Sequence, residues 1–447
     1  MKTIFSLIIL ISSVNLSAQT SYNDVAVIVN TNSNASILIG SYFQTARNIP
    51  DQNMIYISTS TAEDIDSSTF ESLRSQVENH LLSNNLVNSI NYLVTTKGVP
   101  LSVNRGCVID PTISNKCASV DSELTLILGS FASSIGQANS ILNPYFDSHA
   151  NFSRQNEGFY LVTRLDGYEV PDIYNLIDNS GPDTGINPNS TQSIVDISNA
   201  IGNDSSYFVG LYTPTYDSLQ AGGWNALFDS DTLPVLNQSN VLGYYGLGHG
   251  PLPSATFNYE WTKGSVASMS MCNSAFTFDL AANTTNGVLI ADLIADGCTA
   301  AMGNVDYIYF SQIAPTDIFV NRYYDPVNNY NLAESFYMME SRLSWQAVIV
   351  GDPKASVQRD DFANAPETEL EQVSIYPNPS SGFVSVTSDK DITSIEVVDV
   401  SGKRVDVSQQ EINGEVQLNF YSVQDGVYLI LIETGGLIRQ ERILINH

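Results

Sequence analysis

The sequence has few positive charges. Of its 447 residues, 18 are Lys or Arg and 47 are Asp or Glu, which gives a formal net charge of −29. Charged residues of both signs make up only 15% of the chain, against about 25% in an ordinary globular protein. A negative field of this size repels phosphate groups, so we expect no nucleic-acid partner and no binding to anionic membrane surfaces.

Cysteine and histidine are also scarce. Four Cys residues in a chain of this length do not make a disulfide scaffold. Cys107 and Cys117 lie close together and could form a disulfide, but spacing alone does not fix the pairing. The four His residues do not have zinc-ligand spacing. We therefore expect no metal or organic cofactor, apart from a structural Ca²⁺ ion that the many acidic residues would allow.

Long apolar runs are missing as well. The apolar run at residues 4–11 (IFSLIILI) is too short to span a bilayer. It follows Lys2 and precedes Leu16-Ser17-Ala18, the pattern of a secretory signal peptide that is cleaved after Ala18. The sequence thus predicts a signal peptide at residues 1–18, no membrane-spanning helix, and a protein exported through the periplasm to the outer cell surface or the medium.

Residues 19–358 have the pattern of an α/β fold. Apolar runs of strand length alternate with stretches of helical spacing, which predicts a mostly parallel sheet with helices on both faces. The Gly/Pro/Asn-rich stretch 178–192 could divide this body into halves at 19–180 and 193–358. Strands are expected at residues 25–29, 54–57, 90–95, 159–163, 207–211, 241–245, 265–271 and 347–350. Helices are expected at residues 36–46, 69–83, 286–296 and 331–341.

The composition changes after the body. Residues 359–373 are acidic and lack apolar periodicity, which predicts a linker. From residue 374 to residue 447, short alternating strands are separated by Ser-Gly, Asn-Gly and Asp-Gly turns. Regular turn spacing of this kind is typical of a small all-β sandwich.

The last 75 residues or so also resemble a known family of domains. Tyr376-Pro377-Asn378-Pro379, the Gly382 turn, Gly402-Lys403 and Asp425-Gly426-Val427-Tyr428 follow in the order found in C-terminal sorting domains of the type IX (Por) secretion system of Bacteroidetes. The resemblance implies that residues 374–447 are recognised by the export machinery and usually removed. It also implies that the rest of the chain is then released or attached to surface lipopolysaccharide.

Polar residues follow several of the predicted strands, at the edge of a parallel sheet where ligands bind. Lys97 could contact an anion, or it could be a solvent-facing residue before a turn. Arg164 and Asp166 could form a fixed ion pair or bind a carboxylate substrate. Asp121 and Glu123 could take part in capping a helix, with Ser119 or Asp121 as the N-cap, or they could bind a cation.

A second pair of strands carries residues suited to nucleophilic catalysis. His249 follows one predicted strand and Cys272 follows the next, 23 residues later. If these strands are parallel neighbours, both side chains leave the same edge of the sheet. An imidazole there would raise the thiolate fraction of the cysteine and later protonate the leaving group. A buried structural cysteine and a histidine in a glycine loop are the alternative explanation.

The body also resembles two groups of proteins. It is similar to an uncharacterised family of exported bacterial proteins, which implies no particular reaction. That similarity lies in the segments SYFQTARNIPDQNMIYI, NYLVTTKGVPLSV, ASVDSELTLIL, YLVTRLDG, LIADLIADGCTAAMGNV and NLAESFYMMESRLSWQAVIVGDP. Residues 205–357 are more distantly similar to caspase-like cysteine peptidases of the gingipain type, because one apolar strand ends in His-Gly and another in Cys. That resemblance implies a caspase-like fold with Cys272 as nucleophile and His249 as general acid and base. No residue that would read the substrate side chain at the cleavage site can be identified.

Three functions follow from these observations. The first is a secreted or surface cysteine peptidase or related hydrolase that uses Cys272 and His249. The second is a non-catalytic surface protein that binds a peptide or glycan with residues from the polar clusters. The third, a metal-dependent hydrolase that uses acids such as Asp121, Glu123 and Asp166, lacks a histidine cluster. The binding residues of the second function would be Lys97, Asp121, Glu123, Arg164 and Asp166.

Overall fold

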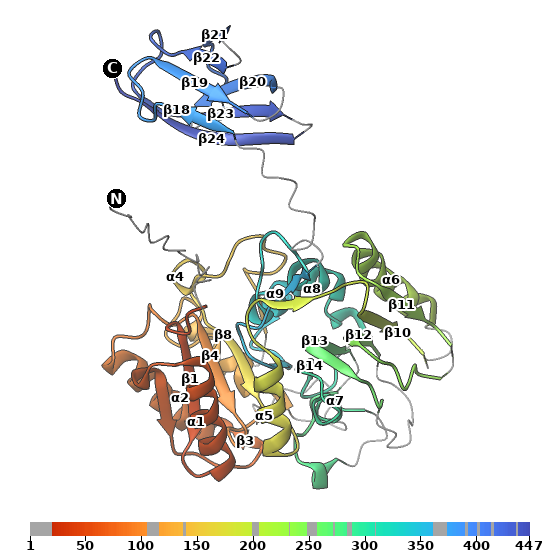
Figure 1. Ribbon diagram of the computed structural model, residues 1–447. Helices are drawn as coiled ribbons and strands as arrows, with labels where there is room; N and C mark the ends of the chain where they lie inside the picture. The colour runs from red at the N-terminus through yellow and green to blue at the C-terminus, as the bar shows by residue number, and fades with distance from the viewer. Residues whose placement is uncertain are drawn as a thin grey trace, which may run out of the picture. The chain divides into compact units, whose positions relative to one another are not determined.

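The computed structural model divides into two compact units, residues 1–361 and residues 362–447 (Figure 1). Each unit is described by itself. The structure describes residues 20–104, 116–136, 140–198, 205–231, 233–247, 257–270, 273–283, 288–308, 310–360, 373–388, 392–399, 403–412, 415–434 and 437–447.

The first unit is built on a ten-stranded sheet (Figure 1). All neighbouring strands pair in parallel except β14 and β16, which are antiparallel. From one side to the other the strands are β11 (Ala226–Asp229), β10 (Gln192–Asp196), β12 (Val241–Gly246), β13 (Trp261–Met269), β14 (Ala300–Asn304), β16 (Ala347–Val350), β8 (Leu161–Leu165), β4 (Tyr92–Thr96), β1 (Val25–Asn30) and β2 (Met54–Ile57).

The single antiparallel junction gives the sheet two edges of different composition. Strands β2, β1, β4, β8 and β16 run in one direction, and strands β14, β13, β12, β10 and β11 run in the other. We call the edge at the carboxyl ends of β1, β4 and β8 the first edge, and the edge at the carboxyl ends of β12, β13 and β14 the second edge. Polar residues that follow strands in the two groups are therefore carried to opposite edges.

Helices cover both faces of this sheet, as the continuous apolar strands predict. All six residues of β1 are buried, which requires packing on both sides. Thr95 and Thr96 are successive residues of β4, so their side chains point to opposite faces. Thr95 donates a hydrogen bond to Asp121 in α3 (Val120–Leu124), whereas Thr96 bonds to Ser36 in α1 (Asn34–Arg47). The α/β architecture is thus confirmed.

The helix ends follow ordinary capping rules. The Ser33 side chain accepts a hydrogen bond from the Ser36 amide at the start of α1, and Asn48 ends that helix in the left-handed conformation. Asn331 and Glu334 form a capping box at the start of α9 (Leu332–Met339). The other helices are α2 (Ser67–Ser83), α4 (Arg154–Glu157), α5 (Val170–Asn179), α6 (Ser205–Ala221), α7 (Ile290–Ala295) and α8 (Thr316–Tyr323).

One predicted strand is wrong. Residues 207–211, expected to form a strand, lie inside helix α6. Their apolar run is short, and the buried residues of α6, Phe208, Tyr212, Thr215 and Leu219, recur with helical spacing. Tyr207 and Val209 are exposed, so burial follows the helical period rather than a continuous run.

Smaller sheets complete the first unit. The stretch 178–192 contributes β9 (Thr184–Ile186), which pairs with β17 (Val357–Arg359), and then enters the main sheet at β10. Strands from both of its sides therefore belong to one sheet. The remaining strands are β3 (Asp64–Asp66), β5 (Ser102–Asn104) and β6 (Lys116–Ser119) in one sheet and β7 (Ile141–Leu142) with β15 (Arg342–Leu343) in another.

The Gly351-Asp352-Pro353 segment has a structural role. The Asp352 carboxylate is buried and accepts hydrogen bonds from the Tyr22 hydroxyl at 2.8 Å and from Arg47 Nε at 2.6 Å. Arg47 also donates to the carbonyls of Ile177 and Ser180. The ion pair joins the end of β16 to the last turn of α1, and the Tyr22 hydrogen bond joins it to the start of the described chain.

The second unit is a β-sandwich, as predicted. One sheet contains β18 (Ser374–Tyr376), β19 (Phe383–Thr387), β22 (Glu415–Asn419) and β21 (Ser408–Ile412), and the other contains β20 (Ile392–Asp399), β23 (Gly426–Thr434) and β24 (Leu437–Ile445). All pairings are antiparallel. Val384 and Leu418 of the first sheet and Ile430 of the second belong to one buried apolar core.

Candidate functional site

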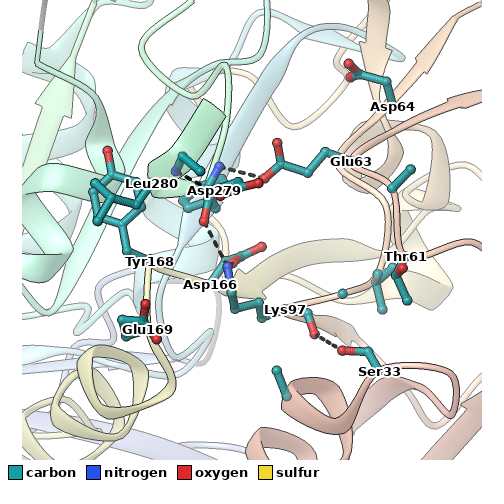
Figure 2. A pocket seen from close by; sticks show the side chains of 16 residues that line it. Ser33, Thr61, Glu63, Asp64, Lys97, Asp166, Tyr168, Glu169, Asp279 and Leu280 are labelled. Carbon is teal, nitrogen blue, oxygen red and sulfur yellow. Dashed lines mark hydrogen bonds and ion pairs between the residues drawn. The ribbon is translucent and has the colours of Figure 1, made fainter. Parts of the chain in front are cut away.

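A cleft of about 890 Å³ opens at the first edge of the sheet (Figure 2). We call it the carboxylate cleft because acidic residues dominate its lining. Its walls are formed by the start of α1, the segments that follow β2, β4 and β8, and residues 278–281. The charged residues that line it are Glu63, Asp64, Lys97, Asp166, Glu169 and Asp279.

Arg164 lies at the centre of a buried ion-pair network beside this cleft. Its guanidinium donates to both oxygens of Asp121, at 2.8 and 3.0 Å, to Asp166 Oδ2 at 2.8 Å, and to the Pro100 carbonyl at 3.0 Å. Burial opposes the charge of Arg164, but the carboxylates of Asp121 and Asp166 outweigh it and raise the pKa of the guanidinium. The sequence left two roles open for Arg164 and Asp166, a fixed ion pair or binding of a carboxylate substrate. In the structure they form a fixed ion pair.

Lys97 lines the cleft and is held by three acceptors. Its ammonium group donates to the carbonyls of Gly167 at 2.7 Å and Phe278 at 2.8 Å, and it lies 3.5 Å from Asp166 Oδ1. These three acceptors match the three N–H donors of an ammonium group. Lys97 therefore fastens the segment around Phe278 to the first edge.

Glu63 holds the same segment from the other side. Its carboxylate accepts hydrogen bonds from the Thr277 hydroxyl at 2.6 Å and from the Phe278 amide at 2.7 Å. Burial raises the pKa of Glu63, and these hydrogen bonds oppose that rise. The wall of the carboxylate cleft at residues 277–278 is thus fixed by a carboxylate and an ammonium group together.

The acids of α3 have separate partners. Ser119 is the N-cap, since its side chain accepts a hydrogen bond from the Ser122 amide. Asp121 faces Arg164 and Thr95, whereas the Glu123 carboxylate accepts a hydrogen bond from the Gly136 amide at 3.0 Å. In the described part of the chain, no group of three or more His, Cys, Asp or Glu side chains could hold a metal ion.

The structure therefore brings four of the predicted site residues together. Lys97, Asp121, Arg164 and Asp166 form one connected network, and Glu123 lies on the same helix as Asp121 but outside the network. Every charge in this network meets an opposite charge or a hydrogen-bond partner. This is the arrangement of a structural support beneath a cleft rather than of a set of free binding groups.

His249 and Cys272 lie outside the described residues, but the strands before them are described. Strands β12 and β13 are parallel neighbours, and their last residues, Gly246 and Met269, are partners in the pairing register. In the sequence, His249 comes three residues after Gly246, and Cys272 comes three residues after Met269. Cys107 also lies outside the described residues, so its disulfide with Cys117 stays a prediction.

Cys298 is buried, as its small-residue surroundings suggest. Its thiol donates to the Ala300 carbonyl at 3.0 Å, and burial raises its pKa to about 12. A thiol in this environment stays protonated near neutral pH and reacts slowly with electrophiles.

A second, smaller cavity lies at the second edge. It is bordered by the carboxyl ends of β13 and β14, by Ile308, by residues 312–314, and by Glu340 directly after α9. We call it the Glu340 cavity. Burial raises the pKa of Glu340 to about 8. The sequence analysis missed this residue, because nothing in its local pattern shows that strands distant in sequence enclose it.

Among the residues that the structure describes, no helix is both long and apolar enough to cross a membrane.

Comparisons of the whole chain with known proteins are weak. No curated protein sequence matches it. A chain of the Saccharomyces cerevisiae separase–securin complex aligns with 65% of this chain at 14% identity and a TM-score of 0.30, and the alignment covers 17% of the yeast chain. A putative β-galactosidase from Bacteroides fragilis aligns with 95% of this chain at 11% identity and a TM-score of 0.16, over 55% of its own length. Neither TM-score establishes a shared fold.

The second unit, in contrast, matches a known domain. Residues 374–446 match the family model of the secretion system C-terminal sorting domain. The match covers nearly the whole β-sandwich and agrees with the motifs at Tyr376, Gly382 and Asp425. The chain is therefore cargo of the type IX secretion system, exported to the cell surface or the medium through a C-terminal sorting domain.

Proposed function

We propose that the exported body is a cysteine-dependent hydrolase of the peptidase type, with Cys272 as nucleophile and His249 as general base and acid. The observation that carries the proposal is the register of β12 and β13, which end side by side at Gly246 and Met269. Neighbouring strands lie about 4.8 Å apart. His249 and Cys272 each lie three residues beyond these strand ends in the sequence, and three residues of chain can reach about 10 Å, which is enough for the two side chains to meet at the second edge.

The reaction would proceed in two steps. His249 takes the proton of the Cys272 thiol, and the thiolate attacks the carbonyl carbon of the substrate. The carbon–nitrogen bond breaks when His249 returns that proton to the leaving amine, which leaves a thioester. Water, deprotonated by His249, then hydrolyses the thioester to a carboxylic acid and regenerates the thiol.

The carboxylate cleft favours a second candidate function, a non-catalytic protein that binds a ligand at the surface. The cleft is large, about 890 Å³, and lies at the carboxyl ends of parallel strands, where ligands bind in α/β sheets. Its acidic lining favours a cationic peptide or an amine-bearing glycan. The supporting network of Arg164 and Lys97 would keep its walls rigid.

Labelling with a thiol-directed peptide probe distinguishes the two functions. The hydrolase predicts labelling of the mature protein that disappears in Cys272→Ala and slows in His249→Ala. Cys298→Ala is the matched control, because it removes a cysteine whose thiol is buried, and it should leave labelling unchanged. Equal labelling of wild type and Cys272→Ala would reject the hydrolase and leave the binding protein.

Export gives a separate test. Deletion of residues 374–447 should leave the body in the periplasm, because the sorting domain is lost while the signal peptide remains. We further propose that the mature body is released or joined to surface lipopolysaccharide after the sorting domain is removed. Sedimentation of the mature protein with outer membranes would indicate attachment, and its recovery from the medium would indicate release.

A further inference from the structure

A short segment of the body connects the two edges of the sheet. We call residues 273–278 the crossing segment. At the second edge, the Ser274 hydroxyl donates to the carbonyl of Met269, the last residue of β13, at 2.7 Å. At the first edge, the guanidinium carbon of Arg164 lies 6.0 Å from the centre of the Phe278 ring. The few residues from Ser274 to Phe278 therefore lead from one edge to the other.

The crossing segment is packed into the interior of the first unit. Its most buried residues are at most 2% exposed: Ser274, Ala275, Thr277 and Phe278. Its main chain is also bonded to the sheet, since the Ala275 amide donates to the carbonyl of Asn304 at the end of β14 at 2.9 Å. Close-packed interiors transmit displacements instead of absorbing them. In the sequence, Cys272 comes directly before this segment.

Two charged residues anchor the first-edge end of the crossing segment. The Glu63 carboxylate accepts from the Thr277 hydroxyl at 2.6 Å and from the Phe278 amide at 2.7 Å. The Lys97 ammonium group donates to the Phe278 carbonyl at 2.8 Å. Hydrogen bonds to charged groups are stronger than those between neutral groups. Both main-chain polar groups of Phe278 are therefore held by a charged side chain.

The two anchors are themselves fixed, and they come from the other group of strands. The main-chain carbonyl of Glu63 accepts hydrogen bonds from the amides of Leu101 at 2.7 Å and Ser102 at 2.9 Å. Lys97 directly follows β4, and its ammonium group also donates to the Gly167 carbonyl at 2.7 Å. The anchors thus connect the far group of strands to the chain that carries the proposed nucleophile.

We propose that Glu63 and Lys97 are positioning residues for Cys272. The proposal rests on the proposed hydrolase: by holding the crossing segment, the two residues set where the nucleophile stands relative to His249. Loss of either charge frees one main-chain group of Phe278 and allows the segment to shift towards the carboxylate cleft, whose wall it forms. A misplacement of about 1 Å can cost a reaction about a hundredfold in rate.

The alternative is a purely structural role, in which Glu63 and Lys97 stabilise the wall of the cleft and nothing more. Loss of stability does not distinguish the two roles, because both predict it. The pH dependence of Cys272 alkylation does distinguish them. A well-placed imidazole keeps part of the thiol ionised below the ordinary cysteine pKa of about 8.5. A misplaced imidazole loses this effect even where the protein stays folded.

The experiment compares the mature wild-type chain with Glu63→Ala and Lys97→Met. Iodoacetamide is applied between about pH 5 and 10, and peptide mass mapping measures modification of Cys272. We expect both variants to react about tenfold or more slowly than wild type near about pH 6.5, with profiles that rise near the ordinary cysteine pKa. With the thiol-directed peptide probe, the maximal labelling rate should fall, whereas the half-saturating concentration should change less than about twofold. Glu63→Gln keeps one acceptor oxygen and should restore part of the rate.

Asp352→Asn is the matched control. It weakens another buried ion pair of the body, because the Asp352 carboxylate bonds to Tyr22 and Arg47 and not to the crossing segment. It should lower stability but leave the pH profile of Cys272 unchanged. Hydrogen exchange gives a second readout that does not depend on the thiol. The amides of residues 273–278 should exchange faster in Glu63→Ala than in Asp352→Asn.

The positioning role and the hydrolase can fail separately. If wild-type Cys272 is reactive and both Glu63→Ala and Lys97→Met keep the wild-type profile, the positioning role is rejected and the hydrolase stands. A similar shift in Asp352→Asn would also reject the positioning role, because general loosening would explain the result. Wild-type alkylation with the ordinary cysteine profile would reject the hydrolase, and the positioning role with it. If Glu63→Ala does not fold, Lys97→Met and Glu63→Gln give the same comparison.

Discussion

The two edges of the ten-stranded sheet surround their acidic residues in different ways. At the first edge, Asp121 and Asp166 share the guanidinium of Arg164, and Lys97 completes its own set of three acceptors. At the second edge, Glu340 has no partner among the described residues. A network that is internally satisfied supports the fold, whereas an unsatisfied group retains the capacity to bind a ligand. The size of the carboxylate cleft is therefore not by itself an indication of chemistry in this molecule.

Loss of Arg164 should have the largest effect on stability. Arg164→Met keeps much of the side-chain volume but leaves Asp121 and Asp166 buried without their shared cation. Breaking a buried ion pair by removing one partner costs about 3–5 kcal/mol. Urea unfolding of the body should show a loss of this size, and a loss below about 1 kcal/mol would mean that the first-edge network is not structural.

Neutralising one acid of the network should cost less. Asp121→Asn retains an oxygen that can accept from Arg164 or Thr95, and Asp166 remains as a counter-ion. We expect a loss of about 1–3 kcal/mol, the range for a weakened buried hydrogen bond. The double variant with Asp166→Asn should lose more than the sum of the single variants, because the pair shares one cation. Strict additivity in urea unfolding would argue that the acids act independently.

The sequence predicts contacts between residues that are close in the chain, but not contacts between residues that are far apart in it. The Arg164–Asp166 pair and the Ser119 cap involve residues two or three positions apart, so their spacing shows them. The role of Lys97 could not be predicted, since one of its acceptors is the carbonyl of Phe278, 181 residues away.

The same reasoning explains the main error and the main omission. The stretch 207–211 was expected to be a strand because its apolar run is short, and only the burial of Phe208, Tyr212 and Leu219 on one face reveals the helix. Glu340 was missed because its surroundings come from β13, β14, Ile308 and residues 312–314. Burial of a single acid by distant segments leaves no local pattern.

Removing the charge of Glu340 should change stability only slightly at acid pH but alter its pH dependence. The folded-state pKa is about 8, and that of an unfolded glutamate is about 4.3. Between these values the unfolded chain has lost the proton that the folded chain retains, so wild type loses stability as pH rises. Glu340→Gln lacks this loss. Unfolding curves of the two proteins should agree near about pH 4 and diverge in favour of Glu340→Gln towards about pH 8.

The two edges also differ in their cysteines. We expect the smallest effect for alkylation of Cys298, which lies at the first edge. Cys298 precedes β14, whose amino end lies at the first edge. Its thiol is buried and donates a hydrogen bond to the Ala300 carbonyl. Burial raises the pKa of this thiol to about 12. Cys272 follows the carboxyl end of β13 at the second edge. Because alkylation requires the thiolate, native protein treated with iodoacetamide near neutral pH should carry little modification at Cys298. Peptide mass mapping measures both sites in one sample, and urea-unfolded protein shows the full extent of labelling. Fast modification of Cys298 in the folded protein would show that the first edge opens to solvent. The contrast between a first edge with paired polar groups and a reactive second edge would then no longer hold.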